Sequence, residues 1–175
     1  MAYSRPEPLR GEHRLEGFDC GDEPLNTWLV RYARHAEAAE SARVFVTRAD
    51  EEHVVGYYAL VVGEVQAADA TARMLKGLPA ERPVPVVVLA RLAVDHRHQS
   101  GGIGRSLLQD AMLRCVRVAE EAGVRALVVH AANDEARDFY RRFGFEESPT
   151  DPLHLILLTK DLRRFLDEAE QTTGG

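Results

Sequence analysis

Apolar positions in the first third of the chain follow two different periods. Between residues 24 and 39 they recur at helical spacing, which predicts an amphipathic helix. The next two stretches, 42–49 and 53–62, are rich in β-branched and aromatic residues and are separated by three acidic residues. This second pattern predicts an antiparallel hairpin.

The rest of the chain alternates apolar runs with helical stripes. The run 86–94 (VVVLARLAV) is nearly all apolar, which is typical of a strand covered on both faces. An apolar stripe over 102–122, ended by Gly123, predicts the helix that follows it. The remaining predicted elements are a strand over 125–131, a helix capped by Asn133, a strand over 153–159 and a short helix over 160–170.

The order strand, helix, strand between residues 86 and 143 requires a right-handed crossover and a parallel strand pair. We therefore expect an α/β fold: a mixed, mostly antiparallel sheet with a central parallel strand pair and helices on both faces. No repeat or Ser/Gly-rich linker interrupts the 175 residues. They predict a single domain over 1–175, with loose ends at 1–8 and 171–175.

Composition excludes several classes of protein. The chain is 45% hydrophobic and 29% charged, and it lacks an apolar run of the roughly 20 residues that a membrane span needs. The N-terminal sequence also lacks the apolar core of a secretory signal. We expect a cytoplasmic protein without membrane attachment, with Cys20 and Cys115 reduced and with no metal, because these cysteines lack metal-site spacing.

The formal net charge of −6 argues against coating of nucleic acid by bulk charge, although a local basic face is compatible with it. All but Lys76 and Lys160 of the 22 basic residues are arginines. This bias favours forked contacts to phosphate or carboxylate, and a genomic codon bias is the alternative explanation.

The clearest candidate for chemistry is the segment 97–105 (RHQSGGIGR), between the strand 86–94 and the helix after it. Glycines let main-chain N–H groups converge on an anion, and a helix start adds partial positive charge. A pyrophosphate is therefore a natural ligand, with a plain flexible turn as the alternative. The segment has neither the lysine of a P-loop nor the GxGxxG order of a dinucleotide fold, which argues against nucleoside triphosphates and NAD.

Two motifs resemble the GNAT acetyltransferases, which use acetyl-CoA. Gln99-x-x-Gly102-x-Gly104, after a strand that ends LAVD, resembles their pyrophosphate loop. The segment 133–145 (NDEARDFYRRFGF) resembles their NxxAxxFYxxxGF segment. The resemblance implies a GNAT-like fold with acetyl-CoA as cosubstrate. Ser100 departs from the pattern, because the loop often carries another glycine there; serine is small and keeps its N–H, so we expect the loop to keep its function.

Other segments resemble the GNAT toxins of bacterial toxin-antitoxin pairs, over about residues 9–162. These segments are 18–21 (FDCG), 25–29 (LNTWL), 55–60 (VGYYAL), 83–86 (PVPV), 89–95 (LARLAVD) and 148–149 (SP). This resemblance implies acetylation of the α-amino group of an aminoacyl-tRNA, which blocks translation. It also implies a ribbon-helix-helix antitoxin as partner, and homodimers are common in the family.

The resemblance implies roles for single residues. Tyr140 matches the general acid that protonates the departing CoA thiolate, with core packing as the alternative. Asn133 matches a pantetheine contact, with a helix cap alone as the alternative. The residues implied to bind acetyl-CoA are Leu92, Ala93, Val94, Gln99, Ser100, Gly101, Gly102, Ile103, Gly104, Arg105, Asn133 and Phe139.

No general base is evident, because residues 84–94 contain no acid where some GNAT enzymes carry a glutamate. A free α-amine has a pKa of about 7.7 to 8.0 and a lysine amine one of about 10.4, so the absence favours an α-amino substrate. Arg91 either contacts an RNA phosphate or pairs with a carboxylate. Candidates for a basic face toward tRNA are Arg91, Arg141 and Arg142, with Arg31, Arg34, His35 and Arg43; water-facing charges are the alternative.

Two alternatives to the toxin stay open. One is a GNAT acetyltransferase of a small amine or a protein N-terminus, and an assay on charged tRNA separates it from the toxin. The third hypothesis is an inactive acyl-CoA-binding interaction domain, against which Tyr140 argues.

Overall fold

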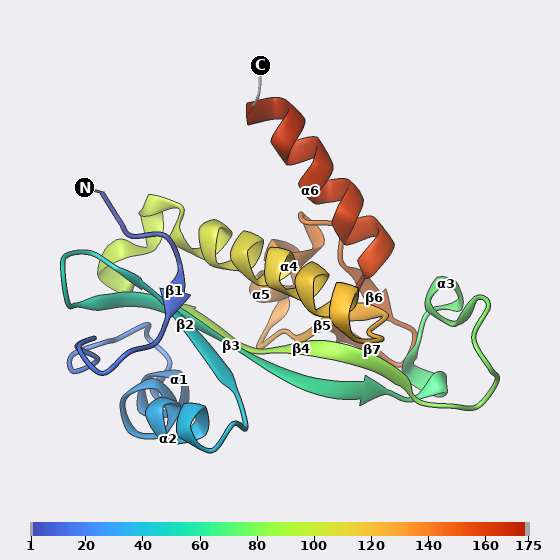
Figure 1. The fold of residues 1–175 in the computed structure, drawn as a ribbon, viewed down its shortest axis with the longest axis horizontal. Helices are drawn as coiled ribbons and strands as arrows, with labels where there is room; N and C mark the ends of the chain where they lie inside the picture. The colour runs from blue at the N-terminus through green and yellow to red at the C-terminus, as the bar shows by residue number, and fades with distance from the viewer. Residues whose placement is uncertain (1, 174–175) are drawn as a thin grey trace. The chain divides into compact units, whose positions relative to one another are not determined.

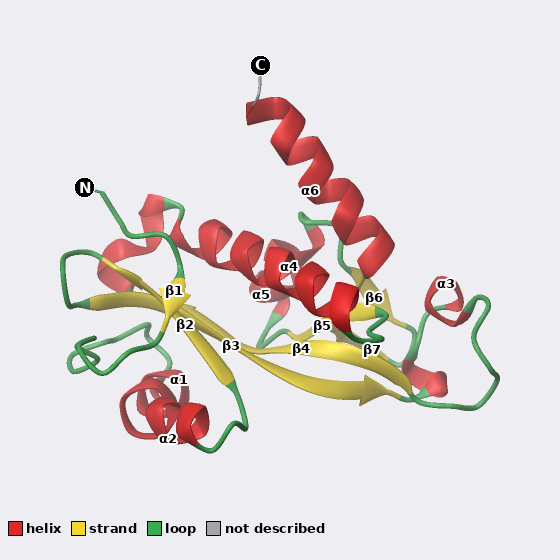
Figure 2. Cartoon of the chain, viewed as in Figure 1, coloured by secondary structure: helices red, strands yellow, loops and turns green. Residues whose placement is uncertain are grey.

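The computed structural model describes residues 2–173. Figure 1 and Figure 2 show its strands and helices. The strands are β1 (Glu7–Pro8), β2 (Arg43–Arg48), β3 (Val54–Val65), β4 (Val84–Val94), β5 (Ala126–His130), β6 (Glu146–Ser148) and β7 (Asp151–Leu158). The α-helices are α1 (Glu23–Thr27), α2 (Ala33–Ala38), α3 (Ala72–Leu75), α4 (Ile103–Glu121), α5 (Asp134–Arg141) and α6 (Thr159–Thr173). The other helical turns are the π-helix η1 (Trp28–Tyr32) and the 3-10 helices η2 (Ala67–Asp69) and η3 (His96–Gly101).

The strands form one seven-stranded sheet in the order β1-β2-β3-β4-β5-β7-β6. The pairs β1/β2, β2/β3, β5/β7 and β6/β7 are antiparallel. The neighbours β4 and β5 are parallel, and the Arg125 N–H donates to the Pro85 carbonyl at 2.8 Å where this pair begins. The predicted mixed sheet with a central parallel pair is confirmed.

The described residues fall into two compact units, residues 2–61 with 89–111 and residues 62–88 with 112–173. In the first unit, helices cover both faces of the strands. Leu29 and Ala33 pack on the face of β2 and β3 that carries Val44, Tyr57 and Ala59. Gly56 points to the other face, where an added Cβ would lie 2.8 Å from Ile103 at the start of α4, so this glycine admits the helix.

The second unit has its own core. Met74 of α3 packs with residues of β4, β5 and β7, among them Val86, Val128 and Ile156. The Arg125 guanidinium donates to the carbonyls of Met74 and Lys76 at 3.0 and 2.8 Å. Side-chain hydrogen bonds to the backbone thus hold the α3 segment against β5.

The N-terminal residues correct one prediction. Residues 1–8 were expected to be loose, but Glu7 and Pro8 pair with Val46 and Phe45 of β2, and the Ser4 N–H donates to the Arg48 carbonyl at 2.9 Å. At the other end, residues 171–173 belong to α6, and 174–175 lie outside the described residues. A single domain over 1–175 stays a prediction.

The cysteines, the helices and the potential metal ligands relate to the expectations of reduced thiols, of no membrane attachment and of no metal. Cys20 and Cys115 are free cysteines, and burial raises the pKa of Cys20 and raises that of Cys115 to about 12. Within residues 2–173, none of the helices combines the length and the apolar composition needed to cross a lipid bilayer. No group of three or more His, Cys, Asp and Glu side chains in the same range is placed to hold a metal ion.

Candidate functional site

Asp95 fixes the point where β4 ends and the predicted loop begins. Its side chain is only 1% exposed. The carboxylate accepts from the Asp19 N–H at 3.1 Å, from the Arg97 N–H at 3.0 Å and from the Arg97 guanidinium at 2.7 Å. The Arg97 guanidinium holds the pKa of Asp95 well below its usual range. The hydrogen bonds of Arg97 to Asp95 therefore stabilise the start of the loop itself.

The predicted loop forms η3 and the first turn of α4. Gln99 Nε2 donates to the Val94 carbonyl at 3.1 Å, which ties the middle of the loop to the end of β4. Gly102 has φ +76°, a left-handed conformation that favours glycine, and an added Cβ there would meet nothing within 4 Å. The exposed Gly102 is thus followed directly by a helix start, with open space beside it.

The first turn of α4 can bind an anion. The Ser106 N–H donates to the Gly102 carbonyl at 3.1 Å, which is the first bond of the helix. The N–H groups before it have no acceptor within the helix, and the helix dipole adds partial positive charge at this end. The sequence of the loop from His96 to Arg105 contains no acid to oppose an anionic ligand. Gln99, Ser100, Gly101, Ile103, Gly104 and Arg105 all lie in this loop and turn, as predicted.

The end of β4 is only partly covered. Ala93 is buried, whereas Leu92 and Val94 are half-buried. Side chains alternate between the two faces of a strand, so Leu92 and Val94 lie on the same face. The expectation of a strand covered on both faces is therefore wrong for this half of β4. An incompletely covered strand end is suited to an extended ligand.

Arg91 is not paired with a carboxylate of the described residues, and its charge is not isolated either. Its guanidinium carbon lies 4.2 Å from the centre of the Trp28 ring, a cation–π contact. Trp28 in turn stacks on Tyr57, with ring centroids 6.0 Å apart, and the Tyr57 hydroxyl donates to the Leu25 carbonyl at 2.8 Å. Among residues 2–173, no carboxylate lies within ion-pair distance of Arg91. Its donors therefore stay available to an external anion.

Trp28 is the partner of Arg91 that the sequence did not indicate. It begins the π-helix η1, where one predicted helix over 24–39 is instead interrupted by a wider turn. Single π-helical turns are rare, and those that occur are often found at functional sites. The contact joins residues 63 positions apart, and helical spacing alone places Trp28 on the apolar stripe of a helix.

In the second unit, Asn133 is the N-cap of α5. Its side-chain oxygen accepts from the Ala136 N–H at 2.8 Å, and the residue is exposed. The predicted cap is confirmed. A pantetheine contact by Asn133 stays a prediction, and its exposure is compatible with one.

Tyr140 lies in an aromatic cluster on α5 and after it. The residue is 6% exposed, and its ring lies edge-on to Phe139 and Phe145, with centroids 5.2 and 5.6 Å away. The hydroxyl makes no hydrogen bond to any residue from 2 to 173. It is nevertheless not completely enclosed, because it is absent from the fully buried side-chain nitrogen and oxygen atoms of these residues that lack a partner. Burial raises the pKa of Tyr140 above the ordinary value of about 10, at which a phenol is already protonated at neutral pH. The ring serves the packing, and the hydroxyl is left for another partner.

The candidate basic residues are mostly engaged. Arg43 pairs with Glu37 at 3.0 Å, and Arg141 lies 3.5 Å from Glu147. Arg142 donates to the Asp138 carbonyl at 3.3 Å, and Arg34 donates to the His13 carbonyl. Arg31 and His35 are exposed. A basic face built from these residues stays a prediction.

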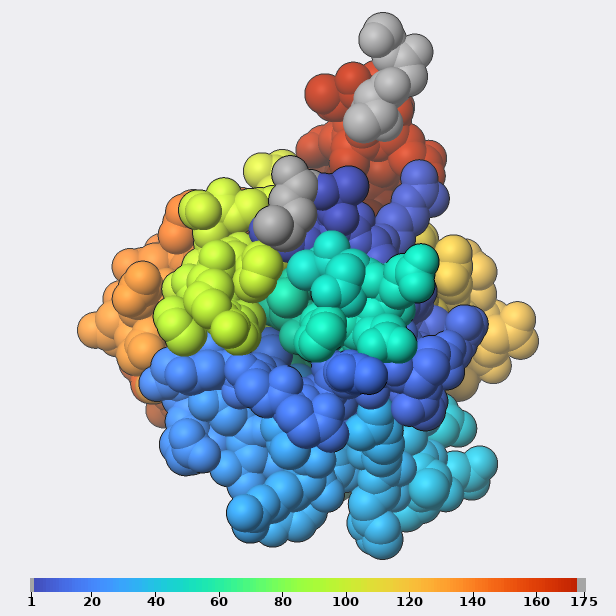
Figure 3. Space-filling model, turned by 90° about the vertical axis from the view of Figure 1, so that its left-hand side faces the viewer, coloured from blue at the N-terminus to red at the C-terminus, as the bar shows by residue number. Residues whose placement is uncertain are grey.

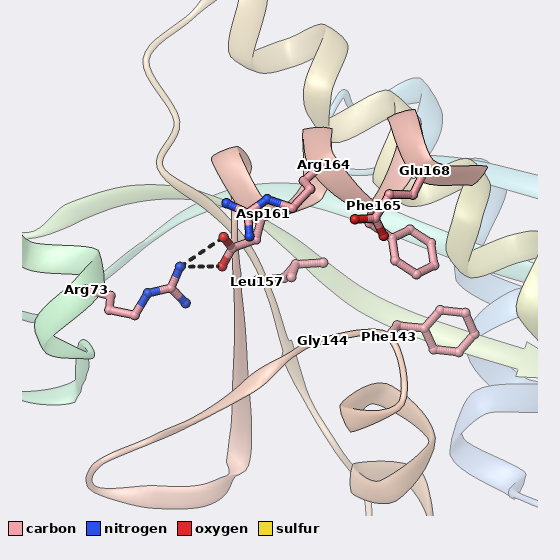
Figure 4. Close-up of a pocket in the computed structure, with 8 residues that line it drawn as sticks. All are labelled: Arg73, Phe143, Gly144, Leu157, Asp161, Arg164, Phe165 and Glu168. Atoms are coloured by element: carbon pink, nitrogen blue, oxygen red, sulfur yellow. Dashed lines mark hydrogen bonds and ion pairs between the residues drawn. The ribbon is translucent and has the colours of Figure 1, made fainter. Parts of the chain in front are cut away.

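A hollow of about 270 Å³ in the second unit involves none of the predicted site residues (Figure 4). Its walls mix charges of both signs with apolar side chains, and Arg73 pairs with Asp161 at 2.9 Å across it. The lining residues are Arg73, Phe143, Gly144, Leu157, Asp161, Arg164, Phe165 and Glu168. The balance of charge does not mark it as a site for a polyanion.

Comparisons with known proteins agree on one family. Residues 40–147 match the model of the acetyltransferase (GNAT) domain. The chain is 45% identical over 166 residues to a tRNA-acetylating toxin of Mycobacterium tuberculosis (strain ATCC 25618 / H37Rv), covering 95% of this chain and 98% of that protein.

Solved structures of AtaT are similar over nearly the whole chain. AtaT complexed with acetyl-methionyl-tRNAfMet has a TM-score of 0.84 and 27% identity, over 94% of this chain and 99% of that chain. A mutant AtaT toxin bound to the C-terminus of the antitoxin AtaR and acetyl-CoA has a TM-score of 0.80 and 26% identity, over 94% and 98%. On the match of domain, sequence and structure, the chain belongs to the GNAT acetyltransferase family.

Proposed function

We propose that this chain is an acetyl-CoA-dependent N-acetyltransferase that acts as a toxin: it acetylates the α-amino group of aminoacyl-tRNA and so blocks translation. The observation that carries the proposal is the 45% identity, over nearly the full length of both proteins, to a tRNA-acetylating toxin. The likeness to AtaT complexed with acetyl-methionyl-tRNAfMet supports the same substrate class.

The loop residues fit acetyl-CoA. The pyrophosphate needs N–H donors and space for a close approach of the main chain. The left-handed Gly102 with its open Cβ position and the start of α4 provide both. Gln99, Ser100, Gly101, Ile103, Gly104 and Arg105 surround this point. The half-covered Leu92 and Val94, with Ala93 between them, are suited to hold the pantetheine arm, with Asn133 and Phe139 as further contacts.

Acetyl-CoA, when bound, supplies the acetyl group and a thiolate that must be protonated as it leaves. Tyr140 is suited to supply that proton, because a phenol is protonated at neutral pH and its hydroxyl has no partner among the described residues. The aromatic cluster holds the ring in place. A free α-amine needs little help to deprotonate, so the absence of an acid in residues 84–94 is compatible with this substrate.

Partners follow from the same relatives. A mutant AtaT is bound to the C-terminus of its antitoxin AtaR, and we propose a small antitoxin, of the ribbon-helix-helix class that the sequence resemblance implies, for this chain. Charged tRNA is a cytoplasmic substrate, so we propose that location. A homodimer stays a prediction.

The test uses purified protein with labelled acetyl-CoA and two pools of the same tRNA, one charged and one deacylated. We expect label on the charged pool only, because the nucleophile is the α-amine of the amino acid. Label on a free amine or a peptide N-terminus, with every charged tRNA unlabelled, would leave a general acetyltransferase. No turnover with any acceptor would leave an acyl-CoA-binding domain.

Gly102→Glu tests the loop through acetyl-CoA binding. The variant places bulk and negative charge at the proposed pyrophosphate position, so calorimetric titration should show loss of acetyl-CoA binding. Gly77→Glu is the matched control, because Gly77 also has a left-handed φ, +81°, and also opens to empty space. Equal affinity in both variants would contradict the assignment of the loop.

A further inference from the structure

The N-terminal segment is held firmly on the first unit. We call residues 3–9 the N-terminal strap. Arg48 N–H donates to the Ser4 hydroxyl at 2.8 Å, and the Leu9 N–H donates to the Val44 carbonyl at 2.9 Å. Glu7 forms an ion pair with Arg48 and a hydrogen bond with His13. The strap is thus anchored along β2 by backbone and side-chain bonds.

At its beginning the strap reaches the proposed cofactor loop. The Tyr3 hydroxyl is hydrogen-bonded to His98 Nδ1 at 3.0 Å, and the two rings lie edge to face with centroids 5.6 Å apart. Figure 3 shows the first described residues, in dark blue, on the same face of the molecule as the loop, in yellow-green. This contact joins residues 95 positions apart in the sequence.

The same ring explains a glycine. A Cβ added at Gly101 would lie 2.9 Å from Cε2 of Tyr3, closer than real side chains allow. Gly101 is not among the residues with positive φ, so its backbone does not require glycine. A Cβ there would instead have to push the Tyr3 ring aside. Tyr3 therefore touches η3 at His98 and again at Gly101, immediately before Gly102.

The loop needs such support. The 3-10 helix η3 spans six residues, and 3-10 runs longer than three or four residues are uncommon because their hydrogen bonds are poor. Asp95 holds its beginning and Gln99 its middle. Tyr3 is the contact that reaches the last residue before Gly102.

We propose that Tyr3 is a positioning residue for acetyl-CoA: it holds η3 so that the N–H groups after Gly101 are preorganised for the pyrophosphate, and Gly101, which has no Cβ, leaves room for its ring. The proposal rests on the proposed function of the loop. A loop held in its binding conformation loses less entropy when a ligand binds, so removing the support weakens binding.

Tyr3→Ala should raise the KM and Kd for acetyl-CoA by about 3- to 30-fold, the scale of one lost hydrogen bond together with the ordering of the loop side chains. The kcat and the KM for charged tRNA should stay unchanged. Tyr3→Phe, which keeps the ring, should show a smaller rise. Tyr32→Ala is the matched control, because Tyr32 is 53% exposed in η1.

A double-mutant cycle with Gly101→Ala separates the strap from a direct ligand contact. In the wild-type background, Gly101→Ala should weaken acetyl-CoA binding, because its methyl group displaces the Tyr3 ring. In the Tyr3→Ala background it should have little further effect, since the ring is already gone. Strictly additive effects would show that Gly101 contacts the ligand itself, and would overturn its role in the proposal.

Hydrogen exchange gives a readout that does not depend on the ligand. In the protein without acetyl-CoA, the amides of residues 96–102 should exchange faster in Tyr3→Ala than in the wild type or in Tyr32→Ala. Unchanged exchange together with an unchanged Kd would overturn the proposal. If the wild type itself fails to bind acetyl-CoA, the proposed function fails, whereas the exchange measurement still decides whether the strap orders the loop.

Discussion

A buried tyrosine can serve packing and chemistry at once when only its ring is used by the fold. The ring of Tyr140 lies between Phe139 and Phe145, and its hydroxyl makes no bond to any residue from 2 to 173. A hydroxyl that stabilised the fold would have a partner. The two alternatives weighed for this residue, core packing and general acid, are therefore compatible with each other.

Tyr140→Phe should lower kcat by roughly 10²- to 10⁴-fold, the usual effect of removing a positioned proton donor. The Kd for acetyl-CoA and the melting temperature should change little, because the ring packing is kept. Tyr58→Phe is the contrasting control, since the Tyr58 hydroxyl donates to Asp110. It should lose stability and keep its turnover. Near-normal kcat in Tyr140→Phe would assign Tyr140 to packing alone.

At the scale of elements, Asp95 joins three parts of the first unit: the end of β4, the turn at Asp19 and η3. Its carboxylate stabilises the fold only when it is charged. Because the Arg97 guanidinium lowers its pKa in the folded protein, this stabilisation is complete above the unfolded value of about 3.9 and is lost as the pH falls through the lowered folded value.

Asp95→Asn should therefore cost about 1 to 3 kcal/mol at neutral pH, the range for hydrogen bonds to a charged group, with screening because Arg97 is 61% exposed. The difference in stability from the wild type should be constant between about pH 5 and 8 and should shrink below about pH 4. Denaturant unfolding across this pH range measures it. Asp167→Asn, an exposed carboxylate on α6, is the control and should show no such change.

Helices and strands whose apolar residues recur with one regular period could be predicted from the sequence. Elements held in place by residues far away in the chain could not. The stripe over 102–122 is α4, and Asn133 caps α5 as its spacing indicates. β1, β6 and α3 have two to four residues each, too few to show a period. The expectation of a loose N-terminus was wrong because the Ser4 and Glu7 side chains find their partner at Arg48, more than 40 positions away.

The candidate site shows the same division. Motif spacing located the loop and Tyr140, because those residues are close in sequence. The stack of Arg91 on Trp28 and the contact of Tyr3 with His98 each join separate elements of the first unit, and no local pattern of residues predicts them. A carboxylate of the chain was one of the two partners considered for Arg91, whereas its guanidinium stacks on an aromatic ring.

For the molecule as a whole, the net charge of −6 makes each phosphate contact to tRNA depend on a few well-placed cations. Several of the candidate arginines pair with carboxylates of the chain, as Arg43 does with Glu37 and Arg141 with Glu147. Arg91 is held by Trp28 without losing its hydrogen-bond donors. It is therefore the arginine that we expect to matter most for charged tRNA.

Arg91→Gln should raise the KM for charged tRNA and make its logarithmic dependence on salt shallower by about 1, because one phosphate contact is lost. Trp28→Leu should also raise this KM but keep the salt dependence, since the charge remains and only its orientation is lost. Arg43→Gln, which removes a charge already paired with Glu37, is the control. The KM for acetyl-CoA should not change in any of the three. A wild-type KM and salt dependence in Arg91→Gln would remove Arg91 from the substrate site.

The two cysteines make the protein well suited to a direct count of its turnovers. Cys115 is fully buried with a pKa raised to about 12, and burial also raises the pKa of Cys20. Only thiolates attack aromatic disulfide reagents, so both side chains should react slowly in the folded protein. The thiol of released CoA then gives nearly all of the rapid colour, without replacement of either cysteine. A burst of protein-derived colour would instead report that Cys20 or Cys115 has become accessible.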